Sequence, residues 1–325
     1  MLKNITIAVD AMGGDGSPKK IVDGIKHHSK NSKGIKYLIF GDKDKILNHI
    51  PKNLNKSCFE IVHTKNCVDG KDTPLEAAKK GKDTSMWLSV DSVKKKESDI
   101  VISAGNTGAL LVISKLNLKM IENIDKPALS ALWPNKTGMS IVLDLGANIE
   151  CNEKNLIDFS IMGASIFKSL YPEETAKVAL LNIGSEEIKG NEVLKNTYQK
   201  LSHIKNNQYE FKGFIEGNEI MNGDVNIIVS DGFTGNVALK TAEGTANFIT
   251  NELKKTYKKN ILGKISGFIN YFNLKSFKKR LDPRLYNGAI FIGLDSPVVK
   301  SHGATDYIGF SNSLSVCEKI VKGDL

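Results

Sequence analysis

The sequence lacks any apolar run long enough to cross a membrane. Its 325 residues are 41% hydrophobic and 25% charged, which is typical of a folded globular protein and not of a disordered one. The longest apolar stretches resemble residues 109–113, far short of the ~20 residues that a spanning helix needs. Asp10 interrupts the first apolar segment before a signal-peptide core could form. We therefore expect a cytoplasmic protein.

Arginine and cysteine are also scarce. Only Arg280 and Arg284 are arginines among 45 basic residues, so an anion bound by the body of the protein must be held by lysine side chains and backbone amides. The four cysteines are widely separated and include no Cys-x-x-Cys pair. This spacing indicates neither a disulfide framework nor a thiolate zinc site.

Several catalytic and nucleotide-binding signatures are missing. The chain has no Gly-x-Ser-x-Gly elbow and no His-Glu-x-x-His pair. It also lacks a Gly-x-Gly-x-x-Gly turn followed by a ribose-binding acid, and it lacks a P-loop. These absences argue against a dinucleotide-dependent dehydrogenase and against a P-loop nucleotide site. An anion site in this chain is expected to take phosphate without a nucleotide.

The basic residues are unevenly distributed. The net charge is +9, and residues 251–280 hold nine basic groups against one acid. The rest of the chain is close to neutral, which disfavours a diffuse nucleic-acid-binding surface. We expect no nucleic-acid partner.

Strand-like and helix-like segments alternate along the chain, a pattern typical of a parallel sheet with helices on both faces. Strands are expected at residues 5–9, 37–40, 59–62, 100–103, 140–144, 178–183 and 225–229. Helices are expected at residues 19–29, 75–90 and 154–170. The sequence thus predicts a three-layer α/β/α fold with a doubly wound, mostly parallel sheet. We expect residues 1–325 to form one unit with a helical excursion at about 250–280.

Five of the expected strands lead into short turns rich in glycine and small polar residues. These turns span residues 10–15, 103–108, 144–148, 182–191 and 231–236. In a doubly wound sheet, ligands bind at the carboxyl ends of the strands. Glycine allows backbone amides to approach an anion closely, and the following helix directs the positive end of its dipole at it. A single such turn can be purely conformational, but five together predict a phosphate site.

A few charged residues lie beside these turns. Lys240 and Lys189 follow or lie within glycine turns, and Lys300 precedes His302 and Gly303 in a strand that ends in a further glycine turn. We expect the lysines to contact phosphate and His302 to move a proton. The aspartates at the strand ends could bind Mg²⁺ or hold the turn amides, and both interpretations stay open. They are Asp10, Asp15, Asp144 and Asp231.

Six motifs together resemble one known family. They are Val-Asp-Ala-Met-Gly-Gly-Asp at 9–15, Ser-Ala-Gly-Asn-Thr-Gly-Ala at 103–109, Leu-Asp-Leu-Gly-Ala-Asn at 143–148, Leu-Asn-Ile-Gly at 181–184, Asp-Gly-Phe-Thr-Gly-Asn-Val at 231–237 and Lys-Ser-His-Gly at 300–303. In this order, from about residue 5 to the C-terminus, they resemble the PlsX phosphate acyltransferases. The chain departs from the family pattern at Gly16, where the family often has histidine or phenylalanine.

The resemblance implies an activity, partners and a fold. Members transfer a long fatty acyl group from acyl carrier protein to inorganic phosphate, and a downstream membrane acyltransferase uses the acyl phosphate for phospholipid synthesis. Their fold is similar to isopropylmalate dehydrogenase and phosphotransacetylase. The resemblance also implies a homodimer without a cofactor or a resident metal.

On this basis the candidate site residues fall into two groups. For catalysis, as donors to the thioester carbonyl or in proton transfer, we expect Asn106, Lys300, His302, Asn236 and Asp231. For phosphate binding we expect Asp10, Gly13, Gly14, Ser103, Gly105, Thr107, Gly108, Asn148, Lys189, Gly232, Thr234, Gly235 and Lys240, and Asn148 is also a candidate carbonyl donor.

Because phosphate is already an anion, direct attack on the thioester suffices. A covalent acyl-enzyme through Cys151 is the rival mechanism, disfavoured because no neighbour in sequence activates the thiol.

The basic segment has apolar residues at helical spacing, flanked by lysines. Such a helix is expected to lie on an anionic membrane surface or to bind acidic acyl carrier protein, and packing against the body or a second subunit is the alternative. The expected contacts are Lys258, Lys259, Ile265, Phe268, Ile269, Phe272, Lys278 and Lys279.

Two other functions remain open. One is a short-chain phosphotransacetylase that uses coenzyme A. The other is a non-catalytic protein that senses anions or serves as a membrane scaffold, in which the basic segment would be the functional part.

Overall fold

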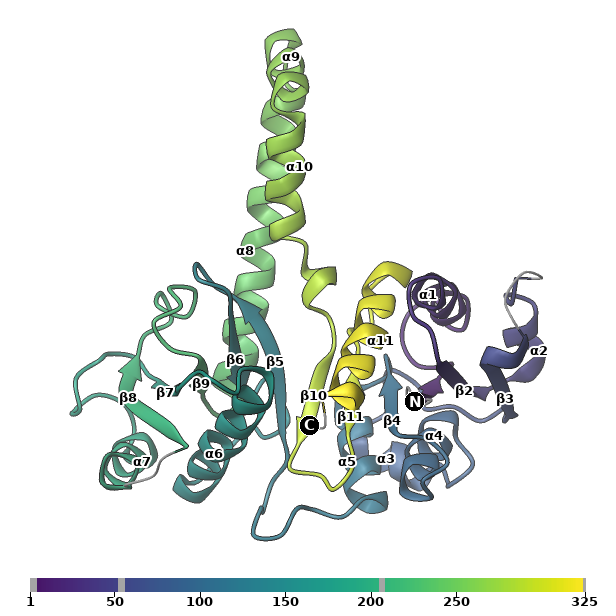
Figure 1. Cartoon of the computed structure of the whole chain (residues 1–325), viewed down its shortest axis with the longest axis horizontal. Coiled ribbons are helices and arrows are strands. Elements are labelled where there is room, and N and C mark those ends of the chain that lie inside the picture. The colour runs from purple at the N-terminus through teal and green to yellow at the C-terminus, as the bar shows by residue number, and fades with distance from the viewer. Residues whose placement is uncertain (1–4, 52–55, 205–207, 324–325) are drawn as a thin grey trace.

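The computed structural model describes residues 5–51, 56–204 and 208–323, and an eleven-stranded sheet runs through them (Figure 1). The strand order is β3-β2-β1-β4-β11-β10-β5-β6-β9-β7-β8. Seven of the ten pairings among the described strands are parallel. Helices cover both faces, so the three-layer α/β/α architecture with a mostly parallel sheet is confirmed.

The first half of the sheet contains five parallel strands. They are β1 (Ile5–Asp10), β2 (Ile35–Gly41), β3 (Phe59–His63), β4 (Ile100–Ser103) and β11 (Val298–Lys300). One face packs on α1 (Lys19–Ser29) and α11 (Tyr307–Lys322), and the other on α4 (Ser85–Lys94) and α5 (Thr107–Asn117). Because side chains alternate along a strand, Ile7 and Val9 face the first pair of helices and Ala8 faces the second. The short helices α2 (Lys43–Leu47) and α3 (Pro74–Lys79) and the 3₁₀ turn Lys56–Cys58 complete this half.

The second half contains four parallel strands. They are β6 (Met139–Leu143), β9 (Ile227–Val229), β7 (Ala176–Leu181) and β8 (Tyr209–Ile215). Helices α6 (Glu153–Leu170) and α7 (Glu192–His203) cover one face, and the first turns of α8 (Gly232–Lys258) cover the other. Between the halves lie β10 (Ala289–Ile292) and β5 (Ala128–Pro134), each antiparallel to both of its neighbours. The 3₁₀ turn Pro283–Tyr286 precedes β10.

A helical arm projects from the sheet. It consists of the outer part of α8 with α9 (Ile261–Ile269) and α10 (Tyr271–Arg280), which runs back along the arm toward the sheet (Figure 1). The side chain of Asn260 caps α9 by accepting a hydrogen bond from the amide of Gly263 at 2.7 Å. The expected excursion at about 250–280 is thus present, and it forms the end of one helix followed by two shorter ones.

Most of the expected elements are confirmed. All seven strands are present with ends shifted by at most three residues, and α1 has the expected bounds. The expected helix at 75–90 is wrong, because Gly81 adopts a φ of +109° and Thr84 caps a new helix by accepting from the amide of Trp87. The sequence analysis did not identify β5, β8 and β10. Among the described residues, no helix has both the length and the apolar character required to span a bilayer.

Candidate active site

The turns after β1 and β4, and the glycine turn after β11, pack against one another at the carboxyl ends of the first half. A Cβ on Gly13 would lie 2.6 Å from the amide nitrogen of Gly105, and one on Gly14, whose φ is +83°, would lie 2.6 Å from the carbonyl oxygen of Ala104. Glycine is therefore required for this approach. The amide of Asp15 also donates to the carbonyl of Gly303 at 3.0 Å. These contacts join three strand ends into one surface.

Asp10 lies beneath this surface and is only 1% exposed. Its carboxylate accepts hydrogen bonds from the hydroxyls of Ser85 at 2.7 Å and Ser103 at 2.6 Å and from the amide of Met12 at 3.2 Å. Ser103 in turn accepts from the amide of Gly105 at 3.0 Å. Burial raises the pKa of Asp10, and the hydrogen bonds oppose that rise. Asp10 and Ser103 therefore support the turns from below. Because both side chains are buried, they cannot contact an anion bound at the surface. The expected contact of these two residues with phosphate does not fit this geometry.

Asp144 has the corresponding position in the second half and is fully buried. Its carboxylate accepts from the amides of Leu129, Ala147 and Asn148 at 2.7–3.0 Å and from the amide of Gly146 at 3.2 Å. Burial raises its pKa, and these hydrogen bonds oppose that rise.

The turns after β6 and β9 are held together closely as well. The amide of Gly232 donates to the carbonyl of Asn148 at 2.7 Å, and a Cβ on Gly232 would lie 2.5 Å from that oxygen. Gly235 packs against the backbone of Asp144. Two of the expected turns of this half therefore meet.

Two of the three candidate asparagine donors are already engaged. The side-chain amide of Asn148 donates to Pro127 at 2.7 Å and to Asp144 at 2.8 Å. That of Asn106 donates to the carbonyls of Gly70 and Asp72, both at 3.1 Å. Each group has two N–H hydrogens, so neither is free to bind a substrate carbonyl. Asn236 is exposed on α8. Within the described part of the chain, its side-chain amide makes no hydrogen bond.

The remaining polar candidates form helix N-termini. Asn106 caps α5 by accepting from the amide of Ala109 at 3.0 Å, and Asp231 caps α8 by accepting from the amide of Thr234 at 2.7 Å. Thr107 is the first residue of α5, and the following Gly108 packs against Pro74. Two helix N-termini thus lie at the turns, where their dipoles favour a bound anion.

A cluster of cations joins the two halves. Lys240 of α8, whose helix begins in the second half, places its Nζ 3.2 Å from Nε2 of His302 in the first half and 2.7 Å from the carboxylate of Glu243. Lys300 precedes His302 in the chain, is only 8% exposed and donates to the carbonyl of Ser301. Burial, with Lys20 and Lys240 nearby, lowers the pKa of Lys300 to about 8. Desolvation lowers the pKa of His302, and Lys240 lowers it further.

Lys20 completes the cation cluster, and the sequence analysis did not identify it. This residue of α1 is 8% exposed, and its Nζ donates to the carbonyl of Gly303 at 2.6 Å. Burial lowers its pKa, and the charge of Asp15 opposes that shift. Lys19 has the same place after the glycine turn, so no sequence signal distinguished Lys20. We name the three lysines Lys20, Lys240 and Lys300, together with His302, the cation cluster. Burial lowers the pKa values of Lys20 and Lys300, and a bound anion would favour their charged forms.

Lys189 lies apart from this cluster. It is exposed in the turn after β7, and its carbonyl accepts from the side-chain amide of Asn182 at 3.2 Å. Within the described residues, no contact joins it to the cation cluster. Arg284 is also engaged elsewhere, by Asp282 at 2.6 Å and Asp306 at 2.8 Å.

Cys151 is half-buried beside the turns of the second half. Burial, with the charge of Asp144 nearby, raises the pKa of its thiol to about 12. Because the thiolate is the nucleophilic form, this shift argues against a covalent acyl-enzyme at Cys151.

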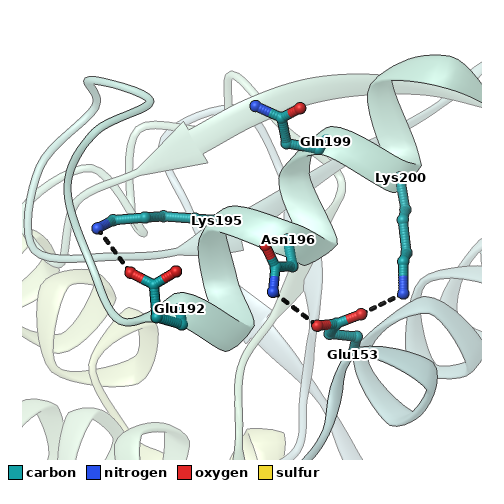
Figure 2. A pocket seen from close by; sticks show the side chains of 6 residues that line it. All are labelled: Glu153, Glu192, Lys195, Asn196, Gln199 and Lys200. Atoms are coloured by element: carbon teal, nitrogen blue, oxygen red, sulfur yellow. Dashed lines mark hydrogen bonds and ion pairs between the residues drawn. The ribbon is translucent and has the colours of Figure 1, made fainter.

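A surface depression between α6 and α7 has a different character (Figure 2). Glu153 pairs with Lys200 and accepts from Asn196 at 2.8 Å, and Glu192 pairs with Lys195 at 3.2 Å. These charges neutralise one another, and none of the candidate site residues lines the depression. In the described ranges, no three metal-ligating side chains are grouped as a metal site would require.

The fold is that of the phosphotransacetylases. The phosphotransacetylase of Streptococcus pyogenes superposes with a TM-score of 0.66 at 13% identity, over 96% of this chain and 92% of that one. The EutD phosphotransacetylase of Staphylococcus aureus gives 0.60 at 15% identity with the same coverage. A 4-hydroxythreonine-4-phosphate dehydrogenase of Klebsiella pneumoniae gives 0.56 at 10% identity, over 98% of this chain and 99% of that one. At these identities the likeness concerns the fold alone.

The sequence defines the family more narrowly. The model of a family described as "Fatty acid synthesis protein" matches residues 5–325. The phosphate acyltransferase of Pelagibacter ubique is 75% identical over all of this chain and 97% of the relative, and that of Rhodospirillum rubrum is 42% identical over 99% and 92%. The chain belongs to this family of enzymes, the phosphate acyltransferases, which confirms the resemblance found in the six motifs.

Proposed function

We propose that the protein transfers a long-chain fatty acyl group from acyl carrier protein to inorganic phosphate. The product, an acyl phosphate, would serve a downstream membrane acyltransferase in phospholipid synthesis. The observation that carries the proposal is the cation cluster, in which lysines from α1, α8 and β11 meet beside His302 at the glycine turns. An anion held there would lie between the two half-sheets.

The reaction balances without a cofactor. An oxygen of hydrogen phosphate attacks the thioester carbon, the C–O bond forms as the C–S bond breaks, and the thiolate leaves. Acyl phosphate retains two negative charges, so the proton released by phosphate equals the proton that the thiolate gains. His302, whose lowered pKa keeps it neutral at pH 7, can accept the first and deliver it to sulfur.

Charge stabilisation has two sources in this proposal. The lysines and the backbone amide of Thr107 hold the phosphate oxygens, and Asn236 donates to the carbonyl oxygen as negative charge develops there. Asp231 contributes indirectly, because it caps the helix that presents Asn236 and Lys240. The residues Gly13, Gly14, Gly108, Gly232, Thr234 and Gly235 shape or cap the turns, and Lys189 is a weaker candidate for phosphate.

One assay tests the proposal directly. Palmitoyl carrier protein is incubated with the enzyme, with and without phosphate, and acyl phosphate is trapped with hydroxylamine. We expect hydroxamate only when phosphate is present. Loss of thioester without phosphate would contradict direct attack, and no loss in either case would favour the non-catalytic scaffold. A preference for acetyl-coenzyme A would favour the short-chain phosphotransacetylase.

We further propose that the arm attaches a cytoplasmic homodimer to anionic membranes or docks the carrier protein. Its apolar side chains are strongly exposed, with Phe268 at 84% and Phe272 at 80%. Ile265 and Ile269 are also exposed. Lysines 258, 259, 278 and 279 are exposed nearby, and each basic group near anionic lipid contributes on the order of 1 kcal/mol.

Vesicles test the membrane contact. Phe268→Glu with Ile269→Glu should lower co-sedimentation with anionic vesicles at least tenfold, since each large apolar side chain buried contributes about 1.5 to 3 kcal/mol. Unchanged co-sedimentation would contradict lipid insertion, and loss of carrier-protein binding instead would assign the arm to that partner.

A further inference from the structure

Large apolar side chains are exposed at the carboxyl ends of the second half of the sheet. Ile149 follows the turn after β6, Ile183 and Ile188 lie in the turn after β7, and Phe233 and Val237 begin α8. Their exposed fractions are 75%, 80%, 80%, 63% and 50%. We name these five residues the second-half apolar surface. Within the described turns after β1, β4 and β11, no large apolar side chain is exposed to this extent.

The elements that carry this surface are neighbours. The amide of Gly232 donates to the carbonyl of Asn148 at 2.7 Å. The backbone segments that lead into Phe233 and Ile149 therefore meet at the strand ends. The parallel register pairs Leu180 of β7 with Val229 of β9, so the turn after β7 follows directly beside the turn after β9.

The second-half apolar surface is continuous with the cation cluster. Phe233, Val237 and Lys240 are spaced four and three residues apart on α8 and therefore share one face of the helix. Seven residues of helix span about 10 Å. Lys240 is the residue that reaches His302, so the apolar face of α8 ends at the position where the anion would bind.

An acyl phosphate requires an anion site and an apolar surface that adjoin each other. Its phosphate is bonded to the carbonyl carbon of the fatty acyl group. The apolar chain therefore begins directly beside the bound phosphate. Each methylene that leaves water strengthens binding about fourfold. Beside the cation cluster, the first turns of α8 expose Phe233 and Val237, which could receive the start of such a chain.

We infer that the second-half apolar surface binds the acyl chain of the thioester donor and sets the preference for long chains. The inference rests on the proposed function and adds a binding surface for the acyl chain. Phosphate lies against the turns of the first half, the carbonyl lies near Asn236, and the methylenes run along Phe233, Val237 and Ile149 toward the turn after β7.

Chain-length dependence tests this inference. The kcat/KM for donors with 4, 8 and 16 carbons is measured at saturating phosphate for the wild type and for Ile149→Ser with Phe233→Ser. We expect the double variant to lose at least tenfold with the 16-carbon donor and less than twofold with the 4-carbon donor, with the phosphate KM unchanged. Both residues are exposed, so the variant should fold. Leu47→Ser on α2, at the far end of the sheet, is the matched control because Leu47 is also exposed.

Photolabelling supplies a readout that does not depend on turnover. A palmitoyl thioester with a diazirine on the chain should label peptides that contain residues 149, 183–188 and 233–237. Labelling elsewhere would overturn the inference, and so would a double variant that keeps the chain-length dependence of the wild type. If that variant instead changes only the oligomeric state, this surface is an interface between copies of the chain.

The two proposals fail in different ways. If the proposed function is wrong, the wild-type enzyme makes no acyl phosphate from any donor. If only this inference is wrong, the wild type remains active with long-chain donors and the double variant behaves as the wild type does.

Discussion

Both halves of the sheet use a buried aspartate to hold the turn at the end of a strand, but the two aspartates accept different hydrogen bonds. Each has a buried aspartate at the end of a strand, Asp10 in the first and Asp144 in the second, and burial raises the pKa of both. Asp10 accepts mainly from serine hydroxyls, whereas Asp144 accepts from backbone amides and an asparagine side chain. Above them the halves differ again, with Lys20, Lys300 and His302 on the first and the exposed side chains of Ile149, Ile183 and Phe233 on the second. The comparison suggests that the halves divide the substrate between them.

The largest expected effect concerns the cations of the first half. Lys20→Met should lower kcat/KM for phosphate about a hundredfold, equivalent to roughly 3 kcal/mol, because it removes a charge from the anion site. Lys19→Met is the matched control, since Lys19 is the adjacent residue but pairs with Asp23 at the surface. Steady-state kinetics with varied phosphate measures both. An equal effect of the two variants would remove Lys20 from the site.

The next prediction compares how much stability is lost when each of the two aspartates is replaced. Asp144→Asn should lower the free energy of unfolding by about 2 kcal/mol, since either orientation of the new NH₂ group meets N–H donors. Asp10→Asn should cost less than about 1 kcal/mol, because the hydroxyls of Ser85 and Ser103 can rotate to accept from it. Urea denaturation provides the comparison. Equal losses would show that the two turns depend on their aspartates in the same way.

A smaller effect is expected from pH. Lys300 has a pKa of about 8, so it holds an anion when protonated below that pH and loses its charge above it. The kcat/KM for phosphate should therefore fall about tenfold between pH 7 and pH 9. In Lys300→Met the whole profile should lie lower, and this falling limb should be absent. A falling limb that persists in the variant would assign the titration to another group.

Local sequence predicted the parts of this fold that local forces determine. The buried strands β1, β4 and β6 are short apolar runs that end in glycine turns, and α1 begins after a proline. By contrast, β5, β8 and β10 are partly exposed, and two of them are antiparallel connectors, so their pattern is weaker. The break between α3 and α4 depends on a single glycine conformation at Gly81.

The site was less predictable because it depends on which groups are already paired. The motifs correctly indicated that the turns after β1 and β4 meet and that those after β6 and β9 meet, and they placed His302 and Lys300 at one strand end. They could not show that the amides of Asn106 and Asn148 are used within the protein. Lys20 was missed because a lysine in the first turn of a helix is usually solvated, and only the tertiary contact with Gly303 reveals its position.

Helix α8 connects the reaction site to the tip of the arm as one continuous rod. Its 27 residues span about 40 Å, begin at the Asp231 cap and include Lys240 near their base. The contact between Lys240 and His302 therefore lies on the same helix as the residues that lead to the arm. If the arm docks as proposed, a tilt of α8 as a unit would change the spacing between these two side chains.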